Sequence, residues 1–296
     1  MRLISLSLLA AATLATTACS PLRLSQSPDM KLEYPEVLVV LTRDHTLLTV
    51  QASRPDHVLD KHTLTGLRDG DRILGIDYRP KNKKLYAFGA LSQVYEVDTQ
   101  EHRFVPLGSN PYIKLAGSDF GVNIDPDTDQ LRVVSDKGLN VSFSLDSGLL
   151  ASTNNATRYT ENDVQEEHAS ALTAIAHTYN KVNDRMTTAF VVDKRLGMLA
   201  RLGSEAGREP VLSPNTGWLS TIGPLGPGAL GGVHLDVSLD TGNAFFITKG
   251  YSSVLYRVDL KLGKTTKMGA VAGNEQAGFA LQPYGVVNVK GVAPGK

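Results

Sequence analysis

The chain has 296 residues, of which 42% are hydrophobic, and its 30 Lys and Arg residues balance 30 Asp and Glu residues. A chain of this length can bury the core of one all-β domain or of two smaller domains, and its balanced charge excludes a general attraction to nucleic acid or to an anionic membrane surface. The single cysteine excludes a disulfide within the chain.

The first 18 residues are predicted to be a signal peptide. Arg2 precedes an apolar stretch from Leu3 to Ala15, which is too short to span a membrane, and small residues lead into Cys19. The position of Cys19 resembles a bacterial lipobox, which implies cleavage before Cys19 and lipidation of that residue. Ser20 then implies sorting to an outer membrane, since a non-Asp residue at this position is typical of that destination. A plain signal peptide with an incidental cysteine is the less favoured alternative, because a free exposed thiol is unfavourable in a secreted protein.

Residues 19–35 are predicted to be the lipidated cysteine and a flexible tether. Three prolines interrupt this polar stretch, which shows no sustained periodicity. As a flexible coil it would span roughly 20 to 25 Å. We expect a folded domain at residues 36–283, a C-terminal tail at residues 284–296, and a location at the outer membrane facing the periplasm.

Five segments share one pattern of alternating apolar and polar residues that runs into a turn: LGIDYRP, FGVNIDP, TAIAHTY, GGVHLDV and AGFALQP. Their spacing of about 45 to 60 residues is typical of the blades of a β-propeller. A hairpin pattern follows each of the first four segments. The fifth segment lies near the C-terminus, whereas its hairpin, VLVVLTRDHTLLTVQ, lies near the N-terminus.

This split arrangement predicts an all-β, five-bladed β-propeller closed by pairing of N- and C-terminal strands. A sixth blade is the alternative if residues 151–171 and 203–217 contain one. A two-sheet sandwich gives no reason for the split. The outer strands are predicted at KHTLTGL, RFVPLG, SGLLAS, GWLSTIG and KTTKMGA.

The stretch FGVNIDPDTDQLRVVSDKGLNVSFSLDSG places Asp125, Asp127 and Asp129 at alternate positions, with Asp136 seven residues beyond Asp129. These positions match part of a calcium loop, but Gln130 stands where such a loop needs glycine. The corresponding turn of another repeat carries cations, in PKNKK. A solvated β-turn is therefore the favoured interpretation, with calcium as a weak alternative and no cofactor predicted.

The strand pattern also predicts a polar channel. Side chains alternate along a strand, so Asp77, Asn123, His234 and Asp236 are expected to share one face of the innermost strands and to converge at a channel wall. Such a cluster can bind a cation or a small polar ligand. It can equally be a wet structural channel whose polar groups satisfy one another, which is the favoured interpretation.

Three segments resemble a bacterial family known as domain of unknown function 4394. They are ILGIDYRPKNKKLYAFG, the aspartate-rich stretch above, and SPNTGWLSTIGPLG. The likeness runs from Ile73 to Gly228, and more loosely to Pro283, with departures at TAIAHTYNKVND and MTTAFVVDKRLGMLARL. It implies a β-propeller-like domain outside the cytoplasm and supplies no catalytic residues.

The sequence predicts an envelope-anchored lipoprotein whose propeller acts as a non-enzymatic binding or scaffolding module, with an envelope protein as its partner besides the membrane. The alternative is a metal-assisted hydrolase or lyase that acts on a carbohydrate or lactone through the polar channel. No nucleophile elbow and no metal-binding histidine spacing identifies catalytic residues, so the question of enzymatic activity stays open at this stage.

Overall fold

The computed structural model describes residues 34–109 and 112–286, and these residues form an all-β domain. The predicted signal peptide, Cys19 and nearly all of the tether lie outside the described residues. Within them the two helices are single 3₁₀ turns, η1 (Pro214–Thr216) and η2 (Pro227–Ala229). No helix of the described residues is long and apolar enough to cross a membrane.

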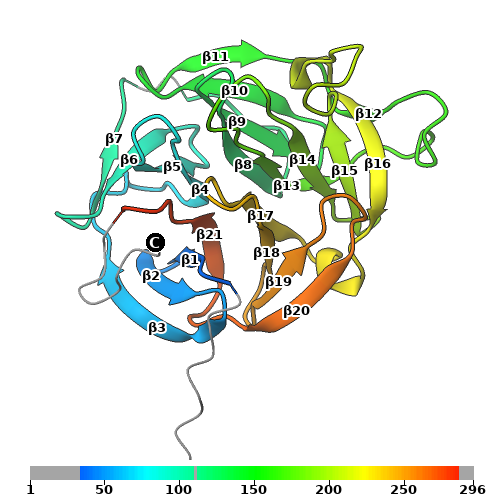
Figure 1. Cartoon of the computed structure of the whole chain (residues 1–296). Coiled ribbons are helices and arrows are strands. Elements are labelled where there is room, and N and C mark those ends of the chain that lie inside the picture. Colours follow the sequence, from blue (N-terminus) through cyan, green and yellow to red (C-terminus); the bar gives the residue numbers. More distant parts are fainter. Residues whose placement is uncertain (1–33, 110–111, 287–296) are drawn as a thin grey trace, which may run out of the picture. The chain divides into compact units, whose positions relative to one another are not determined.

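The strands form five sheets arranged in a ring as propeller blades, and the four main strands of each blade pair antiparallel (Figure 1). The inner strands are β4 (Ile73–Tyr78), β8 (Phe120–Asp125), β13 (Leu172–His177), β17 (Val233–Val237) and β21 (Gln276–Leu281). The second strands are β5 (Leu85–Gly89), β9 (Gln130–Ser135), β14 (Ala189–Asp193), β18 (Ala244–Thr248) and β1 (Val37–Thr42). The third strands are β6 (Val94–Asp98), β10 (Asn140–Ser144), β15 (Met198–Leu202), β19 (Val254–Val258) and β2 (Thr46–Gln51). The outer strands are β7 (Arg103–Pro106), β11 (Leu150–Thr153), β16 (Trp218–Pro224), β20 (Thr265–Ala270) and β3 (Arg54–Thr63).

The ring closes as the sequence predicts. Strand β21, from the C-terminal end of the domain, pairs with β1, from its N-terminal end, with Ala280 opposite Val39. Red β21 and blue β1 therefore lie side by side in one sheet (Figure 1). Pairing both ends of the described domain in one blade leaves none of the five inner strands unpaired.

The stretches considered for a sixth blade form other structures. Residues 151–171 contribute the end of β11 and the two-residue strand β12 (Arg158–Tyr159), which pairs in parallel with β16. Residues 203–217 form turns and η1. The described residues thus hold five blades.

Glycines let neighbouring inner strands approach each other closely. A Cβ atom on Gly121 of β8 would lie 2.6 Å from the backbone of Ala174 in β13, and one on Gly278 of β21 would lie 2.9 Å from Ile76 in β4. Apolar side chains fill the space between the blades beyond these contacts. The channel is consequently narrow and largely occupied by side chains from the inner strands.

Candidate ligand site at the mouth of the central channel

One end of the channel collects charged residues because of the strand order. The inner strands start at this end, and the turns between second and third strands lie at the same end because adjacent strands are antiparallel. Arg43, Lys194 and Lys249 occupy such turns, while Arg72 and Asp119 immediately precede the inner strands β4 and β8. We call this end the mouth.

The mouth contains a cavity of about 360 Å³. Four cationic side chains line it, and the carboxylate of Asp119 is the one acidic group among the described lining residues; the cations are Arg43, Arg72, Lys194 and Lys249. A cavity of this size accommodates a small polar molecule.

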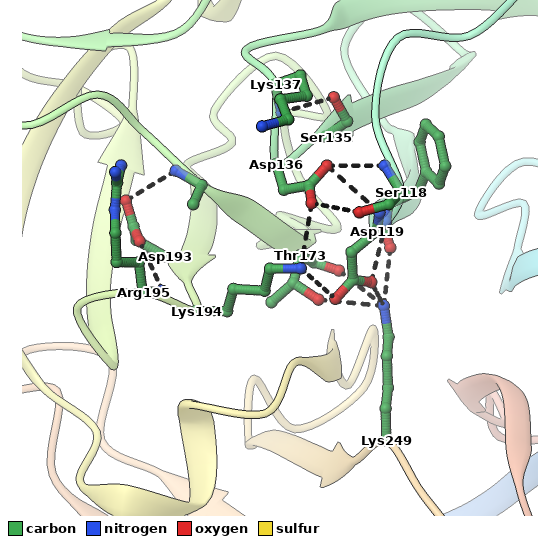
Figure 2. A network of polar contacts seen from close by, with 12 residues as sticks. Ser118, Asp119, Ser135, Asp136, Lys137, Thr173, Asp193, Lys194, Arg195 and Lys249 are labelled. Atoms are coloured by element: carbon green, nitrogen blue, oxygen red, sulfur yellow. Dashed lines mark hydrogen bonds and ion pairs between the residues drawn. The ribbon is translucent and has the colours of Figure 1, made fainter.

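Lys249 is fixed at the edge of this cavity (Figure 2). Its Nζ atom forms an ion pair with Asp119 and donates to the carbonyl oxygens of Phe120, at 3.0 Å, and Thr173, at 3.2 Å. Burial lowers the pKa of Lys249, and the nearby Asp119 opposes this effect. These contacts hold the Lys249 side chain in one conformation at the edge of the cavity.

Lys194 joins a second carboxylate to this network. Its Nζ atom lies 3.2 Å from Asp119 and 3.1 Å from Asp136 (Figure 2). Burial opposes ionisation of Asp136, but hydrogen bonds from the Ser118 backbone and hydroxyl, with Lys194, hold its pKa well below the usual range. Two lysines and two aspartates therefore form a connected network at the base of the mouth.

Two arginines complete the rim. Arg43 is largely exposed and forms an ion pair with Glu275 at 3.2 Å. Arg72 is also exposed, and its guanidinium has no hydrogen-bond or ion-pair partner in the part of the chain that the structure describes. Arg72 is thus a positive charge available to a ligand.

His234 lies at the floor of the mouth. It lines both the mouth cavity and a much smaller hollow deeper in the channel, and its Nε2 atom has no partner among the described residues. Burial lowers the pKa of His234 to about 3, and the positive charge of Lys249 acts in the same direction. The imidazole is therefore neutral near pH 7, and its buried Nε2 atom is a polar group without a hydrogen-bond partner among the described residues.

The other three residues predicted to line the channel connect neighbouring inner strands. An oxygen of Asp77 accepts a hydrogen bond from the Ile124 backbone at 2.6 Å and another from the Asn123 side chain at 2.7 Å. Asn123 in turn accepts from the His177 backbone at 2.9 Å. Asp236 accepts from the Leu281 backbone at 2.7 Å, which repeats the same link between β17 and β21.

The structure therefore brings Asp77 and Asn123 into contact and places His234 elsewhere, at the mouth. Asp77 and Asp236 also influence each other: burial raises the pKa of Asp77 well above its usual value and the charge of Asp236 raises it further. This arrangement resembles a self-satisfied structural channel more than an open set of metal ligands.

The aspartate-rich turn lies at the opposite end of the propeller from the mouth, where β8 ends. Asp129 binds the Arg79 guanidinium at 2.7 Å, and Asp125 pairs with the buried Arg132 at 3.3 Å and accepts from the Asp127 backbone at 3.1 Å. Asp127 is exposed.

Asp136 cannot complete a calcium loop with these residues, because the six residues of β9 separate them and extend over roughly 20 Å. Among the described residues, no group of three or more His, Cys, Asp or Glu side chains is placed to hold a metal ion. Calcium binding at Asp125, Asp127 and Asp129 stays a prediction that the structure leaves without a complete ligand set.

Sequence reasoning missed the lysines of the mouth. Lys194, Lys249 and Arg43 all lie in turns between second and third strands, so aligning the five hairpins would have placed them at one end of the channel. His177 was missed because it follows Ala176, which occupies the channel position of β13, so strand alternation assigns His177 to the other face. Its ring Nδ1 nevertheless lies 2.7 Å from the side-chain oxygen of Asn123.

A family model described as a domain of unknown function, DUF4394, matches residues 46–280. The chain belongs to the DUF4394 family. The match covers nearly the whole of the five-bladed domain, from β2 to β21. The comparison with curated proteins found no significant match to this DUF4394 member.

Several solved structures are similar to it at low sequence identity. A protein of unknown function from Bacteroides caccae has 10% identity and a TM-score of 0.41, with 84% of this chain and 99% of that chain covered. Glutaminyl cyclase from Myxococcus xanthus has 9% identity and a TM-score of 0.41, covering 68% and 76%. A putative gluconolactonase has 11% identity and a TM-score of 0.44, covering 82% and 81%. At these values none of the three indicates what this DUF4394 member binds or does.

Proposed function

We propose that this protein is a non-enzymatic binding module and that the mouth of its channel binds a small hydroxylated anion, such as a sugar acid. The observation that carries the proposal is the unmatched charge of the mouth. Four cations line the cavity, and three carboxylates, Asp119, Asp136 and Glu275, lie against them. One positive charge is left in excess, on the exposed and unpartnered Arg72.

The remaining groups favour a ligand that carries hydroxyls as well as a negative charge. His234 offers a neutral nitrogen with no partner among the described residues, and Asp119 offers carboxylate oxygens at the cavity wall. A carboxylate can pair with a guanidinium through two parallel hydrogen bonds, which fixes its orientation. A ligand with its carboxylate on Arg72 and a hydroxyl near His234 satisfies both ends of the cavity.

Isothermal titration calorimetry with D-galacturonate and neutral D-galactose tests this proposal. We expect galacturonate to bind, and galactose to bind at least tenfold more weakly. The Arg72→Gln change should weaken galacturonate binding at least tenfold, which is the loss expected for one charge-assisted pair. Arg54→Gln is the matched control, since Arg54 is also exposed but lies at the start of β3, at the opposite end of the propeller. Absence of galacturonate binding, or equal loss in both variants, would contradict the proposal.

The alternative, a metal-assisted hydrolase or lyase, finds less support in the geometry. It requires Asp77, Asn123, His234 and Asp236 to hold one ion, whereas three of these side chains already accept hydrogen bonds from neighbouring inner strands. A melting temperature raised by calcium or zinc in the parent protein and left unchanged by the same ions in Asp77→Asn would reverse this preference.

We further propose that Cys19 anchors the protein in a bacterial envelope membrane. The support is the signal-like segment before Cys19 and its resemblance to a lipobox. Metabolic labelling with a fatty acid should mark the parent protein and leave Cys19→Ser unmarked. An unlabelled parent protein would show that the anchor is absent.

A further inference from the structure

A second hollow lies beside the mouth. It has a volume of about 610 Å³, and its lining includes Lys137, Arg158, Arg195 and Lys194. Lys194 also lines the mouth cavity, so the two hollows adjoin at this side chain. Figure 2 shows Lys194 reaching Asp119 and Asp136 from the side on which Arg195 lies.

Three cations of the second hollow carry unmatched charge. The side chains of Lys137 and Arg195 have no hydrogen-bond or ion-pair partner within residues 34–109 and 112–286. The Arg158 guanidinium lies 4.1 Å from the centre of the Trp218 ring, which orients it without neutralising it. Asp136 is the one carboxylate among the described lining residues, and Lys194 already pairs with it.

The floor of the second hollow is made of small residues. Gly138, Ala156, Ala169 and Ala171 belong to its lining, and none of the described lining residues is aromatic. The hollow is thus an open, cation-edged groove next to the mouth.

We propose that the two hollows form one groove that binds a carboxylate-bearing polysaccharide. This inference rests on the proposed function: one acidic sugar occupies the mouth, at Arg72 and His234. The following sugars of the same chain lie along Lys194 and reach the unmatched cations Lys137, Arg158 and Arg195.

The groove suits an acidic glycan better than a nucleic acid. Proteins that bind single-stranded nucleic acid stack bases on aromatic side chains, and the described lining of the second hollow holds no aromatic ring. The chain as a whole has no net charge, so it lacks the long-range field that favours a phosphate backbone. Asp119 and Asp136 lie between the cations, where carboxylates repel closely spaced phosphates but accept hydrogen bonds from sugar hydroxyls.

Calorimetry that compares D-galacturonate with its linear 1,4-linked trimer tests the inference. We expect the trimer to bind at least tenfold more tightly than the monomer to the full chain. In the double variant Arg158→Gln with Arg195→Gln, the trimer should lose this advantage while monomer affinity stays within about twofold. Lys137→Gln provides an independent variant, because Arg158 also contacts Trp218 and its loss could affect folding.

The matched control is Lys261→Gln with Lys264→Gln. These two lysines are exposed in the turn before β20, outside both hollows, and the variant should keep the full preference for the trimer. The melting temperature of each variant confirms that the fold is intact.

The outcomes separate the inference from the proposed function. If the monomer binds but the trimer binds no more tightly, the proposal of an extended groove is wrong and the proposal of a mouth site is supported. If neither binds, both fail. A trimer preference that persists in the double variant and in Lys137→Gln overturns the second hollow as its origin. Binding of a twelve-residue oligothymidylate as tight as that of the trimer shows that the partner class is a nucleic acid and overturns the glycan.

Discussion

The buried side chain of Asp236 accepts two backbone hydrogen bonds, yet burial disfavours its charged form. Its two oxygens accept hydrogen bonds from the backbones of Leu281 and Val237, both at 2.7 Å. Burial nevertheless raises the pKa of Asp236 to about 7, because removing a carboxylate from water disfavours its charged form. Asp77 experiences the same effect, strengthened by the charge of Asp236.

We predict that this pair makes the free energy of unfolding fall as the pH rises. A carboxyl group with a raised folded-state pKa binds its proton more tightly in the folded protein than in the unfolded chain. The decrease in the free energy of unfolding is absent below the unfolded pKa of about 3.8. It grows as the pH rises and is complete above about 7 for Asp236. Asp236→Asn removes the titrating group and should flatten this dependence.

Melting temperatures of the parent protein and of Asp236→Asn between pH 4 and pH 8 measure the effect. The melting temperature of Asp236→Asn should rise relative to that of the parent protein as the pH increases. Asp56→Asn, at an exposed position of β3, is the control and should follow the parent protein. Parallel curves for the parent protein and Asp236→Asn would show that Asp236 is ionised throughout this range.

At the scale of strands, one kind of link recurs between neighbouring blades. Asp77 joins β4 to β8, Asn123 joins β8 to β13, and Asp236 joins β17 to β21, in each case through a backbone N–H of the next inner strand. The equivalent positions in β13 and β21 carry Ala176 and Ala280, so those junctions lack this side-chain link. The polar residues of the channel therefore stabilise three of the five junctions of the ring in this way.

Asn123→Ala should destabilise the protein by about 3 kcal/mol. The change removes the hydrogen bond to Asp77 and both contacts with His177, at about 1 kcal/mol each. Chemical denaturation measures the loss, and Asn274→Ala, at an exposed site, should change stability by less than about 0.5 kcal/mol. A loss of similar size in both variants would show that the link contributes little.

The predicted strands agree with the structure where a strand is buried and agree less well at the edges. The predicted hairpins contain the observed second and third strands, and the predicted inner segments cover the inner strands except for the first residue of β4, β13 and β21, because burial on both faces demands an apolar pattern. The outer strand of the closing blade was predicted at residues 61–67 and is observed as β3 (Arg54–Thr63). Six of its ten residues are exposed, so little apolar alternation marks its start.

At the scale of the whole molecule, stability depends on pairing the two ends of the domain. A chain truncated after Asn274 lacks β21 and leaves the inner edge of β1 without a partner. We expect such a chain to lose cooperative unfolding and to aggregate, because an unpaired apolar strand edge recruits other chains. Thermal unfolding with light scattering tests this, and a chain truncated after Val286, which keeps β21, should unfold cooperatively. A cooperative transition in both chains would show that closure is dispensable.

The zero net charge of the whole chain does not indicate the local excess of positive charge at its mouth. The sequence is neutral, yet the folded domain places unmatched cations along two adjoining hollows at one end. Net charge therefore predicts the weak general attraction to polyanions and says nothing about a local site.

The sequence by itself predicted the repeat, a propeller of five or six blades and its closure, because each depends on apolar periodicity and turn residues within segments of the chain. The tertiary structure decided the number of blades, which is five in the described residues. The sequence also located Asp77, Asn123, His234 and Asp236 on inner strands. The tertiary structure decided what these residues do: three of them link neighbouring strands, while His234 faces the mouth. Asp119, Lys194 and Lys249 lie in different blades and meet only when the ring closes, so their site depends on distances between blades that no local pattern of residues encodes.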